Sequence, residues 1–221
     1  MNGDFFGDED STMRELLRRA TTRREESGQA GEEAANAAAR LAERAAREEL
    51  LDVAYATVDS PFGPLLAAST PRGLVRLAFP EESEDAVLER LADRVSPRIL
   101  HAPGSFGHLE RQLDEYFSGS RRAFATDLDW TLIGPFGRRV LSVTAAIPYG
   151  SVLSYQQVAG EAGSPRGSRA AGNALGSNPI PIVIPCHRVL RTGGNLGGYG
   201  GGLDRKRWLL ELEGALQPEL S

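Results

Sequence analysis

The sequence has a single cysteine, Cys186, among its 221 residues. One cysteine excludes an internal disulfide and any zinc site built from cysteines, so we expect neither a metal nor another cofactor. No apolar stretch approaches the roughly 20 residues that a membrane-spanning helix requires. The first residues also lack the basic and apolar regions of a secretory signal. These absences predict a soluble, cytoplasmic protein without a membrane partner.

The net charge of −5 argues at first against binding to nucleic acid, but the charges are unevenly distributed. Residues 51–134 contain 8 basic and 13 acidic side chains, whereas residues 135–213 contain 9 basic and 4 acidic side chains. The region with the basic excess also contains Cys186. A local basic surface is sufficient for contact with a phosphate backbone, whatever the charge elsewhere.

Residues 1–50 form a polar extension rich in Ala, Arg and Glu. Helices are plausible over residues 12–26, with Ser11 as a cap, and over residues 32–50. Because alanine buries little surface, one interpretation is a mobile or loosely helical extension. The other is a helix that docks on the rest of the chain or on an unknown partner, and the sequence leaves both open.

Residues 51–134 have the pattern of a small α/β domain. Strands are predicted at 51–58, 65–68, 73–79 and 98–101, and helices at 84–95 and 106–117. The sequence Ser60-Pro61-Phe62-Gly63-Pro64 is typical of a turn and separates the first two strands. No constellation of catalytic side chains occurs in this domain.

Residues 135–217 are predicted to be mainly helical. Helices are expected at 136–146, at 154–162 with Ser154 as N-cap, at 165–177 and at 204–213, followed by Gly214 as a C-terminal cap. Prolines interrupt the apolar run 180–185 and exclude a helix interior there. The fold class is therefore α+β, with a small N-terminal α/β domain followed by a mainly helical C-terminal domain.

Cys186 stands in the run Pro185-Cys186-His187-Arg188. Most lone cysteines are small buried hydrophobes, and only the thiolate is a nucleophile. A base or a positive charge must therefore lower the pKa of the thiol from its ordinary value of about 8.5. His187 can accept the proton directly or through water, and a carboxylate that fixes the imidazole is then expected. Glu213, on the last helix, is a candidate for that carboxylate.

The helix expected at 165–177 is nearly bare of large side chains. Its middle contains the small residues Ala170, Ala171, Gly172 and Ala174. One interpretation is tight packing against a neighbouring helix, and the other is insertion into a DNA groove with Arg169 projecting. With the preceding helix and turn, the arrangement resembles a helix-turn-helix.

Together these motifs make residues 51–217 resemble the O6-alkylguanine-DNA alkyltransferases, or methylated-DNA–protein-cysteine methyltransferases. The strongest motif is Ile184-Pro185-Cys186-His187-Arg188-Val189, which matches the acceptor signature of that family. Supporting blocks occur in the same order and spacing: Ser154-Tyr155-Gln156-Gln157, Arg169-Ala170, Asn178-Pro179, Gly197-Gly198-Tyr199 and Trp208-Leu209-Leu210-Glu211-Leu212-Glu213-Gly214. A single four-residue string occurs by chance, whereas six ordered blocks do not.

The resemblance implies a role for each residue around the acceptor. Cys186 would be the alkyl acceptor, His187 would be its base through a water molecule, and Glu213 would orient His187. Asn178 would brace the turn between the recognition helix and the active-site strand.

The resemblance also implies a winged-helix-like helix-turn-helix that enters the minor groove of double-stranded DNA containing an alkylated guanine. Tyr155 would help to expel the target base and would give a proton to the leaving guanine. Arg169 would fill the gap left in the duplex, and Ala170, Ala171 and Ala174 would form the face against the groove.

Tyr199, Val189, Leu175 and Gly200 would line the pocket for the flipped base, Val189 partly through its backbone carbonyl. Gly200 stands where some relatives have a serine or a bulkier residue, so one hydroxyl contact is lost and the pocket is widened. A second acceptor domain, of the kind that makes some relatives transcriptional regulators, is absent from the sequence.

The implied activity is direct-reversal DNA repair by a single-turnover methyltransferase, which we expect to be a monomer. The alkyl group, methyl by default, passes from O6 of guanine or from O4 of thymine to Cys186, and no step regenerates the thiol. One alternative is a non-catalytic sensor of alkylated DNA that recruits other repair proteins, but relatives of that kind lack the acceptor cysteine. A cysteine hydrolase or thiol redox protein would need neither Arg169 nor the Asn178-Pro179 turn.

Overall fold

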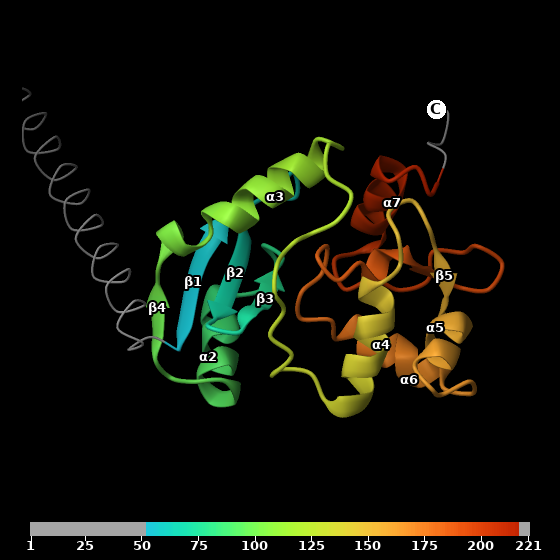
Figure 1. Ribbon diagram of the computed structural model, residues 1–221, viewed down its shortest axis with the longest axis horizontal. Helices are drawn as coiled ribbons and strands as arrows, with labels where there is room; N and C mark the ends of the chain where they lie inside the picture. The colour runs from blue at the N-terminus through green and yellow to red at the C-terminus, as the bar shows by residue number, and fades with distance from the viewer. Residues whose placement is uncertain (1–51, 217–221) are drawn as a thin grey trace, which may run out of the picture.

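The computed structural model describes residues 52–216 of the chain. Within them, a sheet with two flanking helices precedes a group of four helices, and the two parts lie side by side (Figure 1). This arrangement confirms the predicted α+β fold, a small α/β domain followed by a mainly helical domain. The two helices expected within residues 1–50, and Ser11 as a cap, lie outside the described residues.

The N-terminal domain is built on a mixed sheet with the strand order β3-β2-β1-β4. Its strands are β1 (Val53–Val58), β2 (Leu65–Thr70), β3 (Gly73–Ala78) and β4 (Ile99–His101). The first three pair antiparallel through short turns, and β4 pairs parallel with β1 after a helical crossover. The predicted turn between β1 and β2 closes through a hydrogen bond from Gly63 N to Ser60 O (3.1 Å), with Gly63 at a φ of 92°.

Both faces of this sheet are buried. One face packs against α2 (Glu84–Arg94) through the apolar side chains of Val53, Ala68, Val75, Val87 and Leu91. The opposite face joins a larger core that includes α3 (Gly107–Phe117) and the C-terminal domain. Burial of both faces explains why these strands are apolar along most of their length rather than strictly alternating.

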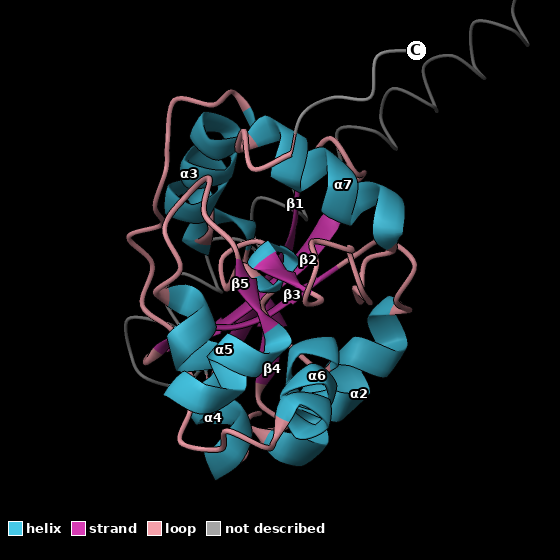
Figure 2. Ribbon diagram, turned by 90° about the vertical axis from the view of Figure 1, so that its right-hand side faces the viewer, coloured by secondary structure: helices cyan, strands magenta, loops and turns pink. Residues whose placement is uncertain are grey.

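The C-terminal domain gathers four helices around a short pair of strands. The helices are α4 (Pro135–Ala145), α5 (Tyr155–Glu161), α6 (Ser168–Gly176) and α7 (Leu203–Leu212), and the parallel strands are β5 (Leu153–Ser154) and β6 (Val189–Leu190). Helices α5 and α6, joined by a turn, form the predicted helix-turn-helix and pack on α4 (Figure 2). Within residues 52–216, no helix combines the length and apolar composition needed to cross a membrane.

Local capping sets the helix boundaries. Ser154 is the N-cap of α5, as predicted, and it forms a reciprocal capping box with Gln157. The prediction that the next helix begins at residue 165 is wrong, because a turn with a hydrogen bond from Gly167 N to Ser164 O (2.7 Å) first reverses the chain. Gly214, at a φ of 71°, follows the end of α7 as the predicted C-terminal cap.

The small side chains of α6 serve two different surfaces. Ala171 is completely buried and packs in the main core, so the expectation that it lies on the groove-facing side is wrong. Ala170 and Arg169 are exposed, and Ala174 is half-buried. Helix packing and an open surface therefore occupy opposite sides of the same bare helix.

The two domains are joined beside the Asn178-Pro179 turn. The carbonyl oxygen of Pro179 accepts hydrogen bonds from Leu77 N (2.8 Å) and from Arg76 Nη1 (3.3 Å), both on β3. An ion pair between Arg205 on α7 and Glu81 lies at the same junction. The edge of the N-terminal sheet thus holds the segment that leads from α6 towards Cys186.

Replacing Ala171 with Leu is expected to destabilise the protein by about 1–3 kcal/mol, because the added side chain overpacks a closed interface. Ala170→Leu is the matched control, since the same side chain would stand in solvent one residue earlier. Thermal or urea unfolding measures both variants. Equal stabilities of the two variants would contradict the placement of Ala171 in the core.

Candidate active site around Cys186

The segment that delivers Cys186 is a buried, proline-punctuated coil. Ile180, Ile182 and Ile184 are all at most 1 % exposed, and a hydrogen bond from Ile184 N to Ile180 O (2.9 Å) folds the segment back on itself. Ile182 has a φ of 73°, a conformation that is unfavourable for a β-branched residue. The expected active-site strand is wrong: Cys186 begins a 3₁₀ turn, η2 (Cys186–Arg188), because the chain turns before β6 starts.

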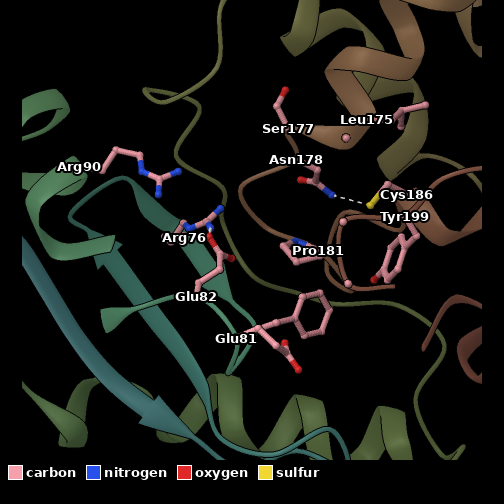
Figure 3. A pocket seen from close by; sticks show the side chains of 14 residues that line it. Arg76, Glu81, Glu82, Arg90, Leu175, Ser177, Asn178, Pro181, Cys186 and Tyr199 are labelled. Atoms are coloured by element: carbon pink, nitrogen blue, oxygen red, sulfur yellow. Dashed lines mark hydrogen bonds and ion pairs between the residues drawn. The ribbon is translucent and has the colours of Figure 1, made fainter. Parts of the chain in front are cut away.

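The side chain of Asn178 holds this coil in place from inside. Its Oδ1 accepts a hydrogen bond from Ile180 N (3.0 Å), and its Nδ2 donates to Ile184 O (2.9 Å). The same Nδ2 lies 3.1 Å from Sγ of Cys186 (Figure 3). Asn178 therefore braces the turn and also contacts the sulfur, a contact that the sequence does not predict.

The thiol of Cys186 is buried and protonated in the resting protein. Burial raises its pKa to about 11, although the hydrogen bond from Asn178 and the ammonium of Lys206 act in the opposite direction. This differs from the expectation that basic neighbours lower the pKa, because desolvation of the thiolate outweighs them. Formation of a nucleophile therefore requires a base that removes the proton.

His187 and Glu213 supply such a base, and the structure brings them together as expected. His187 Nε2 lies 2.9 Å from Glu213 Oε1, and both side chains are fully buried. Burial lowers the pKa of His187 even though Glu213 favours its charged form, so the imidazole is neutral at pH 7. Its other nitrogen, Nδ1, is buried without a hydrogen-bond partner among residues 52–216 and is free to accept a proton.

Glu213 is ionised because its hydrogen-bond donors outweigh its burial. Burial alone would raise the pKa of this carboxyl, but hydrogen bonds from His187, Arg188 and Tyr116 bring it down to about 2. Arg188 donates through Nε to Oε2 (2.8 Å) and through Nη2 to Oε1 (2.9 Å). The contacts of Arg188 and Tyr116 with Glu213 are not predictable from the sequence, because a contact between residues far apart in the chain leaves no local pattern.

Lys206 is a further site residue that sequence reasoning missed. It is fully buried on α7, and its Nζ donates to the carbonyl oxygens of Val189 (2.6 Å) and Gly198 (3.3 Å). Burial lowers its pKa to about 8, while Cys186 acts in the opposite direction. One signal was available: Lys206 is the single lysine in a chain whose other basic residues are all arginine.

Two cavities meet at Cys186. One, of about 550 Å³, is lined by Tyr155, Arg169, Asn173, Leu175, Arg191, Tyr199 and Gly200, among others. The second, of about 380 Å³, lies towards the N-terminal domain and is lined on that side by Arg76 and Arg90 (Figure 3). Both are also lined by Cys186, so the buried sulfur is reached from either side.

The larger cavity contains most of the residues expected around a flipped base. Tyr155 Oη donates to Gly198 O (3.2 Å), and its ring lies against Gly172, where an added Cβ would be 3.7 Å from it. Val189 is the exception: its side chain is completely buried in the core, and its carbonyl oxygen is already bound by Lys206. The expectation that the side chain of Val189 lines the pocket is therefore wrong, whereas its role through the backbone carbonyl stays a prediction.

Comparison with known protein families gives two matches that together cover most of the chain. Residues 53–130 match the 6-O-methylguanine DNA methyltransferase, ribonuclease-like domain, and residues 135–215 match the 6-O-methylguanine DNA methyltransferase, DNA binding domain. The second match contains every residue for which the sequence predicts a role in the site.

Individual relatives agree. The chain is 41 % identical over 168 residues to a methylated-DNA–protein-cysteine methyltransferase of Mycobacterium bovis, covering 74 % of this chain and 94 % of the relative. A Methanosarcina barkeri protein of the same name is 39 % identical over 72 % of this chain and 96 % of its own length. The crystal structure of Mycobacterium tuberculosis OGT in complex with DNA has a TM-score of 0.63 at 40 % identity, covering 73 % of this chain and 93 % of that one.

Replacing Asn178 with Asp is expected to slow the reaction of Cys186 with a small uncharged thiol reagent at least about tenfold, because a carboxylate beside Sγ raises the pKa of the thiol further. Asn195→Asp, at an exposed position that lines neither cavity, is the matched control and should react at nearly the rate of the unmodified chain. Rates are measured by intact-mass spectrometry. An unchanged rate in the Asn178 variant would contradict the role of its amide.

Proposed function

Since the chain belongs to the 6-O-methylguanine DNA methyltransferase family, we propose that it repairs alkylated DNA by accepting the alkyl group on Cys186. One observation carries this proposal most directly. The buried sulfur, held by Asn178 and backed by the His187–Glu213 pair, lies at the wall of a cavity that opens beside the helix-turn-helix.

The chemistry follows from the protonation states of the site. His187, neutral at rest, accepts the proton of Cys186 through a water molecule at Nδ1. The thiolate attacks the alkyl carbon in line, so that an S–C bond forms as the C–O6 bond breaks. The departing guanine takes a proton from the hydroxyl of Tyr155. The product is a thioether, and because no step regenerates the thiol, each molecule acts once.

Access to the base requires it to leave the duplex, at a cost of a few kcal/mol. In this proposal α6 enters the minor groove with Ala170 and Ala174 on its near side, and Arg169 fills the space left by the flipped nucleotide. The exposure of Arg169 and Ala170 supports this orientation. Tyr199, Leu175 and Gly200 line the receiving cavity, and Asn173 and Arg191 join them.

Gly200 sets the width of that cavity. A Cβ added there would meet Gly176 O at 3.7 Å, an ordinary contact, so the glycine leaves room that a side chain would otherwise fill. The proposed substrates are O6-alkylguanine, with methyl as the default group, and O4-alkylthymine as a second base.

The remaining parts of the proposal concern organisation. We infer a cytoplasmic monomer with an α/β domain over residues 51–134 and an alkyl-acceptor domain over residues 135–217. For residues 1–50, which lie outside the described residues, an unknown partner is one of the two alternatives that the sequence leaves open. A non-catalytic sensor of alkylated DNA is a weaker proposal, because Cys186 is present and the base that would activate it is in place.

Incubation with duplex DNA carrying methyl-labelled O6-methylguanine is expected to transfer one label to each protein molecule. The label should stop accumulating when every molecule has reacted, because the thioether is stable. Cys186→Ser should accept no label while still binding the DNA. Transfer to the serine variant, or repeated turnover by the unmodified protein, would rule out Cys186 as a single-use acceptor.

Arg169→Ala is expected to slow repair of duplex DNA about tenfold or more while leaving the reaction with free O6-methylguanine within about twofold, because only the duplex has a gap to fill. Arg166→Ala is the matched control, since it removes an exposed arginine from the turn before α6. Single-turnover rates on both substrates measure the difference. An equal loss on both substrates would refute the role of Arg169 in the duplex.

A further inference from the structure

The carboxylate of Glu213 is shared between the two domains. Its Oε1 accepts hydrogen bonds from Tyr116 Oη (2.6 Å), His187 Nε2 (2.9 Å) and Arg188 Nη2 (2.9 Å). His187, Arg188 and Glu213 belong to the C-terminal domain, whereas Tyr116 lies on α3 of the N-terminal domain, 97 residues before Glu213. The oxygen that holds the imidazole therefore also receives a hydroxyl from the other domain.

The surroundings of Tyr116 fix its hydroxyl as a donor. The side chain is completely buried, and its ring packs edge-on against Phe117 and Tyr149, with centroids 5.4 Å and 6.1 Å away. Burial, followed by the nearby charge of Glu213, raises the pKa of Tyr116 far above its ordinary value, so the phenol stays protonated at all working pH values. A buried phenol that cannot ionise can only give its proton to the carboxylate in a hydrogen bond.

We propose that Tyr116 is a positioning residue through which the N-terminal domain shares the Glu213 carboxylate with His187 and keeps the imidazole in its proton-accepting form. The inference rests on the proposed function, in which His187 takes the proton of Cys186. A hydrogen bond to Oε1 draws negative charge away from the side that faces Nε2. The carboxylate then still orients His187, but it stabilises the imidazolium too weakly for His187 to be protonated at rest.

The other charged and titratable groups around His187 fit this role. Arg188 and Lys206 disfavour the imidazolium, and burial disfavours it more than either. Glu213 is the group that favours it, and the ring of Tyr199 packs edge-on at 6.4 Å. Cys186, the proton donor, is uncharged at rest. The strength of the Glu213–His187 interaction therefore decides whether His187 is unprotonated, and Tyr116 weakens that interaction by donating to the same carboxylate.

The direct test is Tyr116→Phe, which keeps the ring and removes only the hydroxyl. Full-length, unreacted protein with isotope-labelled histidine is titrated by NMR, with His101 and His108 as internal references. The titration midpoint of His187 is expected to move to higher pH by about one unit, a tenfold change in its protonation constant. Methyl transfer requires neutral His187, so the acid limb of the pH profile of the single-turnover rate should move to higher pH by the same amount. The rate at high pH should stay within about threefold of that of the unmodified protein.

Tyr149→Phe is the matched control. Its hydroxyl donates to Leu212 O (2.9 Å), a backbone carbonyl beside the same carboxylate, so the variant removes a similar hydrogen bond without touching Glu213. Neither the His187 midpoint nor the acid limb should move in this variant. Replacing Tyr116 with 3-fluorotyrosine, a stronger donor, should move the midpoint in the opposite direction, to lower pH, and this remains measurable if the Phe variant is unstable.

Two outcomes would overturn the inference. One is an unchanged His187 midpoint in Tyr116→Phe, and the other is a loss of rate that is equal at all pH values, which a purely structural role predicts. Failure of the proposed function looks different, because the unmodified protein would then accept no label from methylated DNA. The His187 titration does not depend on that reaction and still decides the role of Tyr116.

Discussion

The ion pair and hydrogen bonds around the buried carboxylate of Glu213 are the constraint on which the site depends. A charge without water is tolerated only when donors surround it. Here the donors come from η2, which contains His187 and Arg188, from the backbone N–H of Gly150 (3.4 Å), and from α3. The C-terminal end of α7 must therefore meet a turn from the same domain and a helix from the other. Docking of the domains therefore completes the hydrogen bonding around the His187–Glu213 pair.

A second constraint opposes reactivity. The burial that makes the site selective also raises the pKa of Cys186 to about 11, and neither Asn178 nor Lys206 is sufficient to reverse this. A permanently ionised thiol would react with any electrophile small enough to reach it. A protonated thiol beside a neutral imidazole reacts only slowly with stray electrophiles, which suits an acceptor that is used only once.

The sequence predicted best those structural features whose cause lies within a few residues along the chain. Ser154 and Gly214 were recognised because caps depend on neighbouring backbone groups, and the acceptor motif marked Cys186 because its residues are contiguous. Ala171 and the side chain of Val189 were misplaced, since a helix or strand of similar small or apolar residues does not reveal which side faces the core. Tyr116 and Arg76 could not be predicted as site neighbours, because their contacts depend on how two domains dock.

The hydrogen bond from Leu77 to Pro179 has a consequence beyond the site. β3 is the outermost strand on its side of the sheet, and an outer strand with free backbone groups invites pairing with another chain. In the described residues, Leu77 N is used by Pro179, and Leu74 forms a bridge with Leu128. The opposite border, β4, is only three residues long. The contact that steadies the reactive segment thus also guards the sheet against aggregation.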